Sequence, residues 1–180
     1  DSLVTGYRQT SGWARTRTVY FAMAFSKPFY RYGQRNYDEK QVYRGFWRKF
    51  NQTENFPEIA GKNIRMYFDF KTSENEKIKI KFALSPVSQR NALENMKAEI
   101  DGWSFEEVKA RAQQNWNNEL NKIVIEADDD VKTNFYTSLY HTFITPTIYM
   151  DVNGEYKGLD QEVQKADGFT NYTTFSLWDT

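Results

Sequence analysis

The order of its sequence patterns predicts an α+β chain, with strands first and helices second. Apolar side chains alternate with their neighbours along residues 19–25, and again along 64–70 and 78–84. This period of two is typical of strands. From Phe105 to Ile123 the apolar residues instead recur every three or four positions, which is the helical period. Strands followed by helices indicate an α+β fold or two separate domains.

The composition changes after Pro86, where alternation gives way to helical spacing. We therefore place the domain boundary near residue 90, with the strands in residues 1–90. Residues 91–126 are predicted as a helical connector, and residues 127–180 form the segment beyond it.

The strand at 19–25 is followed by Pro28, which marks a sheet edge or a turn. Residues 30–60 have weak periodicity and predict loops around one or two short strands. The runs at 64–70 and 78–84 predict a hairpin, because the polar residues between them suit a turn.

Two helices are predicted in the connector. Leu93, Met96 and Ile100 give helical spacing to residues 91–100. Ser104 followed by Glu107 then makes a capping box at the start of a longer helix.

Asp128, Asp129 and Asp130 begin the next predicted helix, where an N-terminus favours negative charge. A calcium cluster is the alternative, but three consecutive acids cannot all point at one ion, and no glycine-bearing calcium loop follows. Capping is therefore the better interpretation. The helix continues through Phe143 and stops at Pro146.

Composition excludes several classes of function. The 24 basic and 24 acidic residues give zero net charge, whereas a nucleic-acid surface needs a basic excess. Cysteine is absent, which excludes disulfides, thiolate metal sites and a cysteine nucleophile. No apolar run approaches the roughly 20 residues that span a bilayer. Aromatic residues reach 17%, which suits both carbohydrate-handling surfaces and β-sandwich cores. The start at Asp1 fits a mature or cut product.

The residues by themselves show no complete catalytic set. GxSxG, P-loop and GxGxxG motifs are absent from the sequence. Glu106 and Glu107 cannot be the facing acids of a glycosidase, because neighbouring helical residues point apart. His141 is the single histidine, so a histidine metal cluster is excluded. It is either a packing residue of its helix, the commoner case, or a ligand that lines a site.

Beyond that helix, residues 151–154 predict a turn or hairpin, and a polar loop runs from Gly158 to Gly168. The final stretch is dense in aromatic and hydroxyl side chains and ends with Trp178 beside Asp179. A tryptophan face stacks on a sugar ring, and a neighbouring carboxylate accepts hydrogen bonds from sugar hydroxyls. The structural alternative is an aromatic core with a hydrogen-bonded or helix-terminal carboxylate.

Three motifs, in the expected order, resemble those of one enzyme family. Residues 6–13 (GYRQTSGW) followed by 20–23 (YFAM) resemble the late β-sandwich segment of bacterial glycoside hydrolase family 92, the calcium-dependent α-mannosidases. Residues 135–142 (FYTSLYHT) resemble the first barrel helix of that family. Residues 168–172 (GFTNY) with 175–180 (FSLWDT) resemble its next signature.

The resemblance implies an N-terminal β-sandwich joined by helices to an (α/α)6 barrel. Residues 1–90 would be a β-sandwich portion, 91–126 the helical connector, and 127–180 the first helices of the barrel. The barrel would be incomplete, since 180 residues cannot form six helical hairpins. The remainder of a parent polypeptide is therefore an implied partner.

The resemblance also implies an exo-acting, inverting α-mannosidase that acts on mannose-containing glycans, in the periplasm, at the cell surface or secreted. Calcium engages the sugar hydroxyls in the family, a glutamate is the acid and an aspartate the base. All these groups are expected beyond Thr180, so no catalytic or metal residue is assigned here and the fragment is expected to be inactive. Asp179 matches a sugar-hydroxyl ligand, with Trp178 as its neighbour. The alternative is a non-catalytic carbohydrate-binding or structural β-sandwich module.

Overall fold

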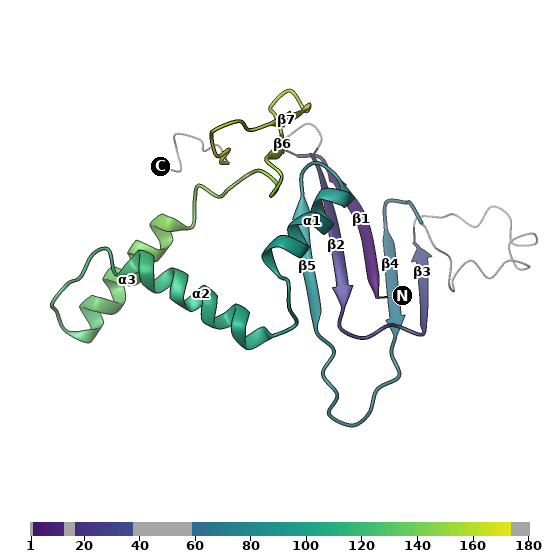
Figure 1. Cartoon of the computed structure of the whole chain (residues 1–180), viewed down its shortest axis with the longest axis horizontal. Helices are drawn as coiled ribbons and strands as arrows, with labels where there is room; N and C mark the ends of the chain where they lie inside the picture. The colour runs from purple at the N-terminus through teal and green to yellow at the C-terminus, as the bar shows by residue number, and fades with distance from the viewer. Residues whose placement is uncertain (1, 13–16, 38–58, 174–180) are drawn as a thin grey trace, which may run out of the picture. The chain divides into compact units, whose positions relative to one another are not determined.

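The computed structural model describes residues 2–12, 17–37 and 59–173. The chain divides into two compact units, whose segments alternate along the sequence. The first unit comprises Asp1–Val4 and Ala24–Ile80, and the second comprises Thr5–Met23 and Lys81–Thr180. In chain order the described elements (Figure 1) are β1 (Leu3–Thr10), β2 (Arg17–Phe25), β3 (Arg31–Asn36), β4 (Ile64–Asp69), β5 (Ile80–Ser85), α1 (Gln89–Glu99), α2 (Phe105–Leu120), α3 (Asp129–Phe143), β6 (Glu155–Lys157) and β7 (Val163–Lys165).

Strands come first and helices second, as predicted, with two short strands added after α3. The strands form a three-stranded sheet in the order β1-β2-β5 and two further pairs, β3 with β4 and β6 with β7. Both pairs are antiparallel, and Gly33 lies opposite Tyr67 in the register of β3 and β4. The strand predicted at residues 19–25 is β2, and β3 is a short strand within the predicted loop region 30–60.

The predicted hairpin between residues 64–70 and 78–84 is wrong in its pairing, although both strands exist. β4 pairs with β3, whereas β5 joins β2. Directly after β2, the N–H of Ser26 donates to the carbonyl of Lys79 at 2.9 Å, and the N–H of Lys79 donates to the Ser26 hydroxyl at 2.9 Å. These bonds hold Lys79, the residue before β5, beside Ser26, the residue after β2. Alternation identifies a strand and its faces but not its partner.

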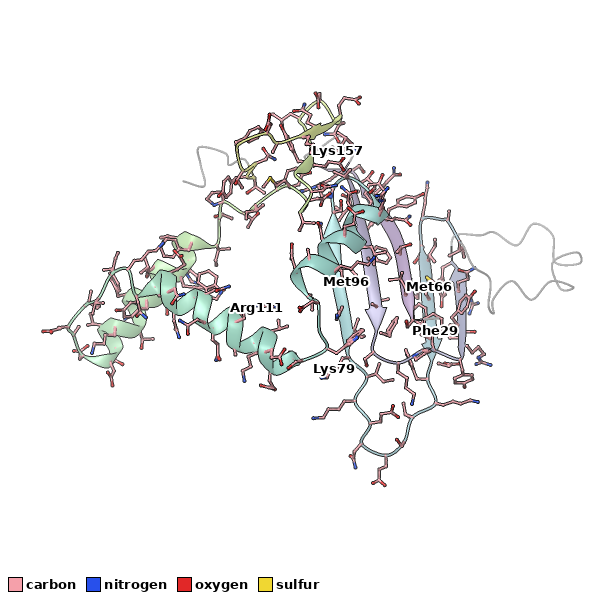
Figure 2. All side chains as sticks on the ribbon, viewed as in Figure 1. Phe29, Met66, Lys79, Met96, Arg111 and Lys157 are labelled. Atoms are coloured by element: carbon pink, nitrogen blue, oxygen red, sulfur yellow. The ribbon has the colours of Figure 1, made fainter. Side chains whose placement is uncertain are left out.

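Aromatic rings form the core of the first unit. Phe25 and Phe29 (the latter labelled in Figure 2) are buried. Their ring centroids lie 5.2 and 5.0 Å from that of Phe68, and Phe70 lies 5.3 Å from Phe25. These separations are in the range of favourable aromatic pairs. These four phenylalanines therefore pack together as the core of the described part of this unit.

Helix α1 buries a face that includes asparagine. Met96, labelled in Figure 2, is buried together with Asn91 and Asn95. The apolar face predicted from Leu93, Met96 and Ile100 is only partly right, because Leu93 and Ile100 are half-buried. The buried face instead consists of Asn91, Ala92, Asn95 and Met96. Two of these side chains are amides, so this helix buries polar groups that need hydrogen-bond partners.

The predicted starts of α2 and α3 are confirmed. The Ser104 side chain accepts the N–H of Glu107 at 3.3 Å, as an N-cap should. Asp128 caps α3 by accepting the N–H of Val131 at 3.0 Å, and the next two acids lie in the first turn. Capping, rather than calcium binding, therefore accounts for the three consecutive acids. α3 ends at Phe143, within a few residues of the expected stop at Pro146.

Helix α3 packs on α2 and on the turn that follows α2. The ring centroids of Trp116 and Tyr140 are 4.5 Å apart, and the Tyr136 hydroxyl donates to the Ile123 carbonyl at 3.1 Å. Neither helix has a fully buried residue. Within the described segments, no helix combines the length and the apolar character needed to cross a membrane.

The segment from Thr147 to Thr173, called here the C-terminal arm, contains the hairpin of β6 and β7. The turn predicted at 151–154 is confirmed, because the N–H of Gly154 donates to the Asp151 carbonyl at 2.8 Å. The polar loop predicted between Gly158 and Gly168 is wrong, since it contains strand β7. Its strand residues are exposed, so no apolar alternation marked them in the sequence.

Candidate functional site

A buried carboxylate, that of Asp151, lies at the centre of a hydrogen-bond network. Asp151 is 3% exposed. Its Oδ2 accepts from Ser85 Oγ at 2.7 Å and from Asn91 Nδ2 at 2.8 Å, and its Oδ1 accepts from Asn95 Nδ2 at 2.7 Å. Burying a carboxylate is costly unless it is hydrogen-bonded. Here both oxygens are satisfied by short bonds from a hydroxyl and two amides.

The local structure brings these donors together. Ser85 ends β5, and its hydroxyl also accepts the N–H groups of Val87 and Ser88 at 2.9 and 3.2 Å. Ser88 then caps α1 by accepting the N–H of Asn91 at 3.0 Å. Asn91 and Asn95 are four positions apart, so they lie on one face of the helix. The turn between strand and helix thus aims one hydroxyl and two amides at the same place.

Asn95 joins three parts of the second unit. Its Nδ2 donates to the carbonyl of Leu84 in β5 at 2.9 Å as well as to Asp151. Its Oδ1 accepts the N–H of Val152 at 2.9 Å. The turn that follows places Gly154 at a φ of +84°, a conformation that favours glycine. α1, β5 and the turn at residue 151 are therefore connected through one side chain.

Glu155, the first residue of β6, shares the amide of Asn91. Asn91 Nδ2 donates to Glu155 Oε2 at 2.8 Å, and Asn153 Nδ2 donates to the same oxygen at 3.1 Å. These bonds favour the charged carboxylate and lower the pKa of Glu155 from its usual value, the bond from Asn91 being the largest cause.

A short antiparallel ladder joins the two ends of the C-terminal arm. The N–H of Tyr149 donates to the carbonyl of Asn171 at 2.8 Å, and the N–H of Thr173 donates to that of Thr147 at 2.9 Å. Asn171 Nδ2 also donates to the Tyr149 carbonyl at 2.8 Å. The ladder pairs residues 147–149, which end two positions before Asp151, with residues 171–173, the last that the structure describes.

The structure tests only one of the site residues singled out in the sequence. Trp178 and Asp179 lie outside the described residues, so their role in sugar binding stays a prediction. His141 lies in the last turn of α3 and is exposed, with its ring centroid 5.8 Å from that of Tyr140. His141 is therefore not buried among the described residues, and its role as a packing residue or as a ligand stays a prediction.

The pocket on α3 and the acidic residues of the described segments can be compared with what a glycosidase site and a metal site need. An open pocket on α3 is lined by Lys132, Thr133, Tyr136, Thr137 and Tyr140. These residues include no carboxylate, so the pocket lacks the acid and base of glycoside hydrolysis. Within the described part of the chain, no three acidic, histidine or cysteine side chains gather closely enough to hold a metal ion. These residues therefore do not fit the calcium ion implied by the resemblance.

Two domain models of one enzyme family match the sequence. The glycosyl hydrolase family 92 N-terminal domain matches residues 1–85, and the glycosyl hydrolase family 92 catalytic domain matches residues 91–180. The chain belongs to glycosyl hydrolase family 92. In this family 92 chain, the bond between Ser85 and Asp151 joins the last residue of the N-terminal match to the catalytic match.

Solved structures are similar to this family 92 chain over nearly its whole length. The family GH92 alpha-mannosidase BT3965 from Bacteroides thetaiotaomicron matches with a TM-score of 0.85 and 40% identity, over 99% of this chain and 24% of that chain. Its complex with mannoimidazole is also solved. The inverting mannosidase BT2199 from the same organism matches with a TM-score of 0.82 and 25% identity, over 99% and 23% of the two chains.

A curated relative comes from the fungus Arthroderma benhamiae. It is an uncharacterized secreted glycosidase, 28% identical over 94 residues, which are 48% of this chain and 12% of that protein. The family 92 chain therefore spans about a quarter of the solved relatives and less of the fungal one.

These matches confirm the predicted fold class, a β-sandwich portion followed by a helical connector and the first helices of an (α/α)6 barrel. The proposed boundaries at residues 90 and 126 stay a prediction. The sequence does not predict the polar network, because its pattern places Asp151 only in a turn. The sequence signal for it is the spacing of Asn91 and Asn95, which places two amides four positions apart on one helix face.

Proposed function

We propose that the parent protein is an exo-acting, inverting α-mannosidase that hydrolyses α-linked mannose in glycans. The observation that carries the proposal is the similarity to a solved α-mannosidase, with 40% identity and a TM-score of 0.85 over 99% of the chain. The likeness to an inverting mannosidase supports inversion at the anomeric carbon. Exo-action rests on the family resemblance.

The proposal assigns sugar binding to Asp179, with Trp178 beside it. A carboxylate that accepts bonds from two sugar hydroxyls makes charge-assisted contacts, while an indole face covers the apolar side of the ring. Inversion needs two carboxyl groups roughly 6.5–9.5 Å apart with a water between them. We assign that pair, and the calcium ligands, to the parent polypeptide beyond Thr180. The name of the secreted relative supports export of the parent.

Assay of the full-length parent on α-linked mannosides tests the proposal. We expect release of single mannose units, with β-mannose as the first anomer detected by proton NMR. Activity should fall in a chelator and return when calcium is added. Release of α-mannose first would contradict inversion, release of longer oligosaccharides would contradict exo-action, and chelator-resistant cleavage would contradict the calcium requirement.

Absence of cleavage on every α-mannoside would instead favour the alternative, a non-catalytic carbohydrate-binding or structural β-sandwich module. The match of residues 91–180 to the catalytic domain of the family favours the enzyme over this alternative. Mannose binding without turnover, measured by calorimetry, would identify the binding module.

A further inference from the structure

We propose that the exposed face of the β3–β4 pair binds an acidic sugar, that is, a sugar unit that carries a carboxylate or a sulfate group. The binding residues are Arg35, Arg65, Tyr37 and Tyr67, and all four belong to the first unit. The inference goes beyond the proposed function, because it uses none of the residues to which that function assigns sugar binding.

The two faces of the β3–β4 pair differ in character (Figure 1). Tyr32 and Phe68 are register partners that face the core, since the ring centroid of Phe29 lies 5.6 and 5.0 Å from theirs. Residues one position away point to the opposite face. On β3 and β4 that opposite face carries Arg31, Gly33, Arg35, Arg65, Tyr67 and Asp69. It is therefore built from charged and aromatic side chains and a glycine.

Two positive charges lie opposite each other on this face. Arg35 and Arg65 are register partners, and both are exposed. Among the described residues neither has a carboxylate partner, whereas Arg31 on the same face is paired with Asp69 at 2.7 Å. Like charges directly opposite each other on two strands destabilise the pair. The face therefore carries an excess of positive charge that a bound anion would neutralise.

Tyr37 brings the two guanidinium groups to one ring. Arg35 Cζ lies 5.0 Å and Arg65 Cζ lies 4.7 Å from the centroid of the Tyr37 ring. These cation–π contacts offset part of the repulsion, but the ring has no net charge, so both positive charges stay uncompensated. Guanidinium groups bind oxyanions through paired N–H donors. The two arginines therefore form a site for one oxyanion group.

Exposed tyrosine rings accompany the arginine pair. Tyr37 is 46% exposed and Tyr67 is 40% exposed. Tyr67 follows Arg65 by two positions, so it lies on the same face, and its register partner Gly33 adds no side chain there. An aromatic ring stacks on the apolar side of a sugar ring, and the chain belongs to a family of carbohydrate-active enzymes. Rings and arginines together therefore fit an acidic sugar better than an acidic peptide.

Calorimetric titration of the full-length parent with oligogalacturonate tests the inference. We expect binding of this uronate and none of its methyl ester, which has the same backbone without the charges. A sulfated oligosaccharide shows whether sulfate serves as well as carboxylate, and binding of either charged sugar supports the inference.

Two variants identify the residues that bind. Arg65→Gln should weaken binding at least about tenfold, because it removes one of two charge-assisted contacts. Arg31→Gln removes the same charge from the same face, but its arginine is already paired with Asp69. It is the matched control and should change the affinity less than about twofold.

Thermal stability separates a binding site from a purely structural contact. Arg65→Glu replaces the repulsion with Arg35 by an attraction across the two strands, so it should raise the melting temperature of the ligand-free protein and abolish binding. A pair selected for its contact with Tyr37 would behave in the opposite way, with a lower melting temperature in Arg65→Glu.

The absence of binding to either charged sugar would overturn the inference, and so would equal affinity for oligogalacturonate and its methyl ester. Equal weakening by Arg31→Gln and Arg65→Gln would show that only the net charge of the face matters. Tighter binding of polyglutamate than of oligogalacturonate would assign the face to an acidic peptide instead. These titrations need no mannosidase activity, so an inactive parent would overturn the proposed function and leave this inference open to its own test.

Discussion

The hydroxyl of Ser85 donates to Asp151 Oδ2 at 2.7 Å, although the two residues are 66 positions apart in the sequence. Both are buried. Ser85 also accepts backbone N–H groups at the start of α1, so one hydroxyl links the end of a strand, the start of a helix and a distant turn. The bond therefore joins the last residue of the N-terminal family match to the catalytic match through one small polar side chain.

Asn95→Ala should destabilise the arm. The substitution removes the bond to the charged Asp151 and leaves the N–H of Val152 without its acceptor. Hydrogen bonds to charged groups contribute about 1.5–3 kcal/mol, so we expect a loss of about 3 kcal/mol in the local opening free energy. Hydrogen exchange at the backbone amides of residues 151–155 measures this loss of local opening free energy. Asn115→Ala, at an exposed position of α2, is the control, and equal effects would contradict the prediction.

Phe29→Ala should weaken the first unit. Phe29 is 8% exposed and packs on Phe25 and Phe68. Removing a buried phenyl ring costs about 3–5 kcal/mol, which urea unfolding followed by fluorescence can measure. The neighbouring Tyr30 is 58% exposed, so Tyr30→Ala should cost less than about 1 kcal/mol. A larger loss at Tyr30 than at Phe29 would show that this core is wrongly assigned.

The stabilisation that the Glu155 carboxylate gives the folded protein should disappear in acid. Its pKa is lowered from 4.5 in the folded protein by the bonds from Asn91 and Asn153. A lowered folded pKa means that the stabilisation is present above pH 4.5 and is lost as pH falls through the folded value. Glu155→Gln should therefore reduce thermal stability at pH 7 and have less effect at acid pH. The exposed Glu162 provides the control, and a pH-independent difference at Glu155 would refute this account.

Asp179→Asn in the full-length parent should lower kcat/KM by at least about tenfold, because the substitution keeps the shape but removes the charge that strengthens hydroxyl bonds. The melting temperature should change little. Kinetics and a melting curve on one sample separate this from a structural role, which predicts a lower melting temperature with normal kinetics. Asp167→Asn, at an exposed position of the C-terminal arm, serves as the control.

The isolated 180-residue chain should be inactive on α-mannosides. In the proposal it lacks the acid, the base and the calcium ligands, and general acid–base catalysis by one positioned group alone contributes roughly 10²–10⁴-fold. Turnover measured on the purified chain, with the parent as the positive control, checks the expectation. Mannosidase activity that co-purifies with the chain itself would mean that the acid and base lie within these residues.

The sequence determined which segments are strands and helices wherever the signal is local. The alternation at 19–25, the capping residues Ser104 and Asp128, and the glycine-closed turn at 151–154 all depend on near neighbours in the chain. Its motifs also indicated the family, because the three signatures in order are specific together even where each is weak.

Only the tertiary structure decided the strand partners and the buried network. β5 joins β2 rather than β4, and hydrogen bonds between Ser26 and Lys79, which are 53 positions apart in the sequence, support this pairing. Alternation carries no information about partners at that distance. Asn91, Asn95 and Asp151 read as surface residues, since amides and carboxylates are ordinarily exposed. They are buried because each satisfies the hydrogen bonds of the others, and that condition exists only once the chain has brought them together.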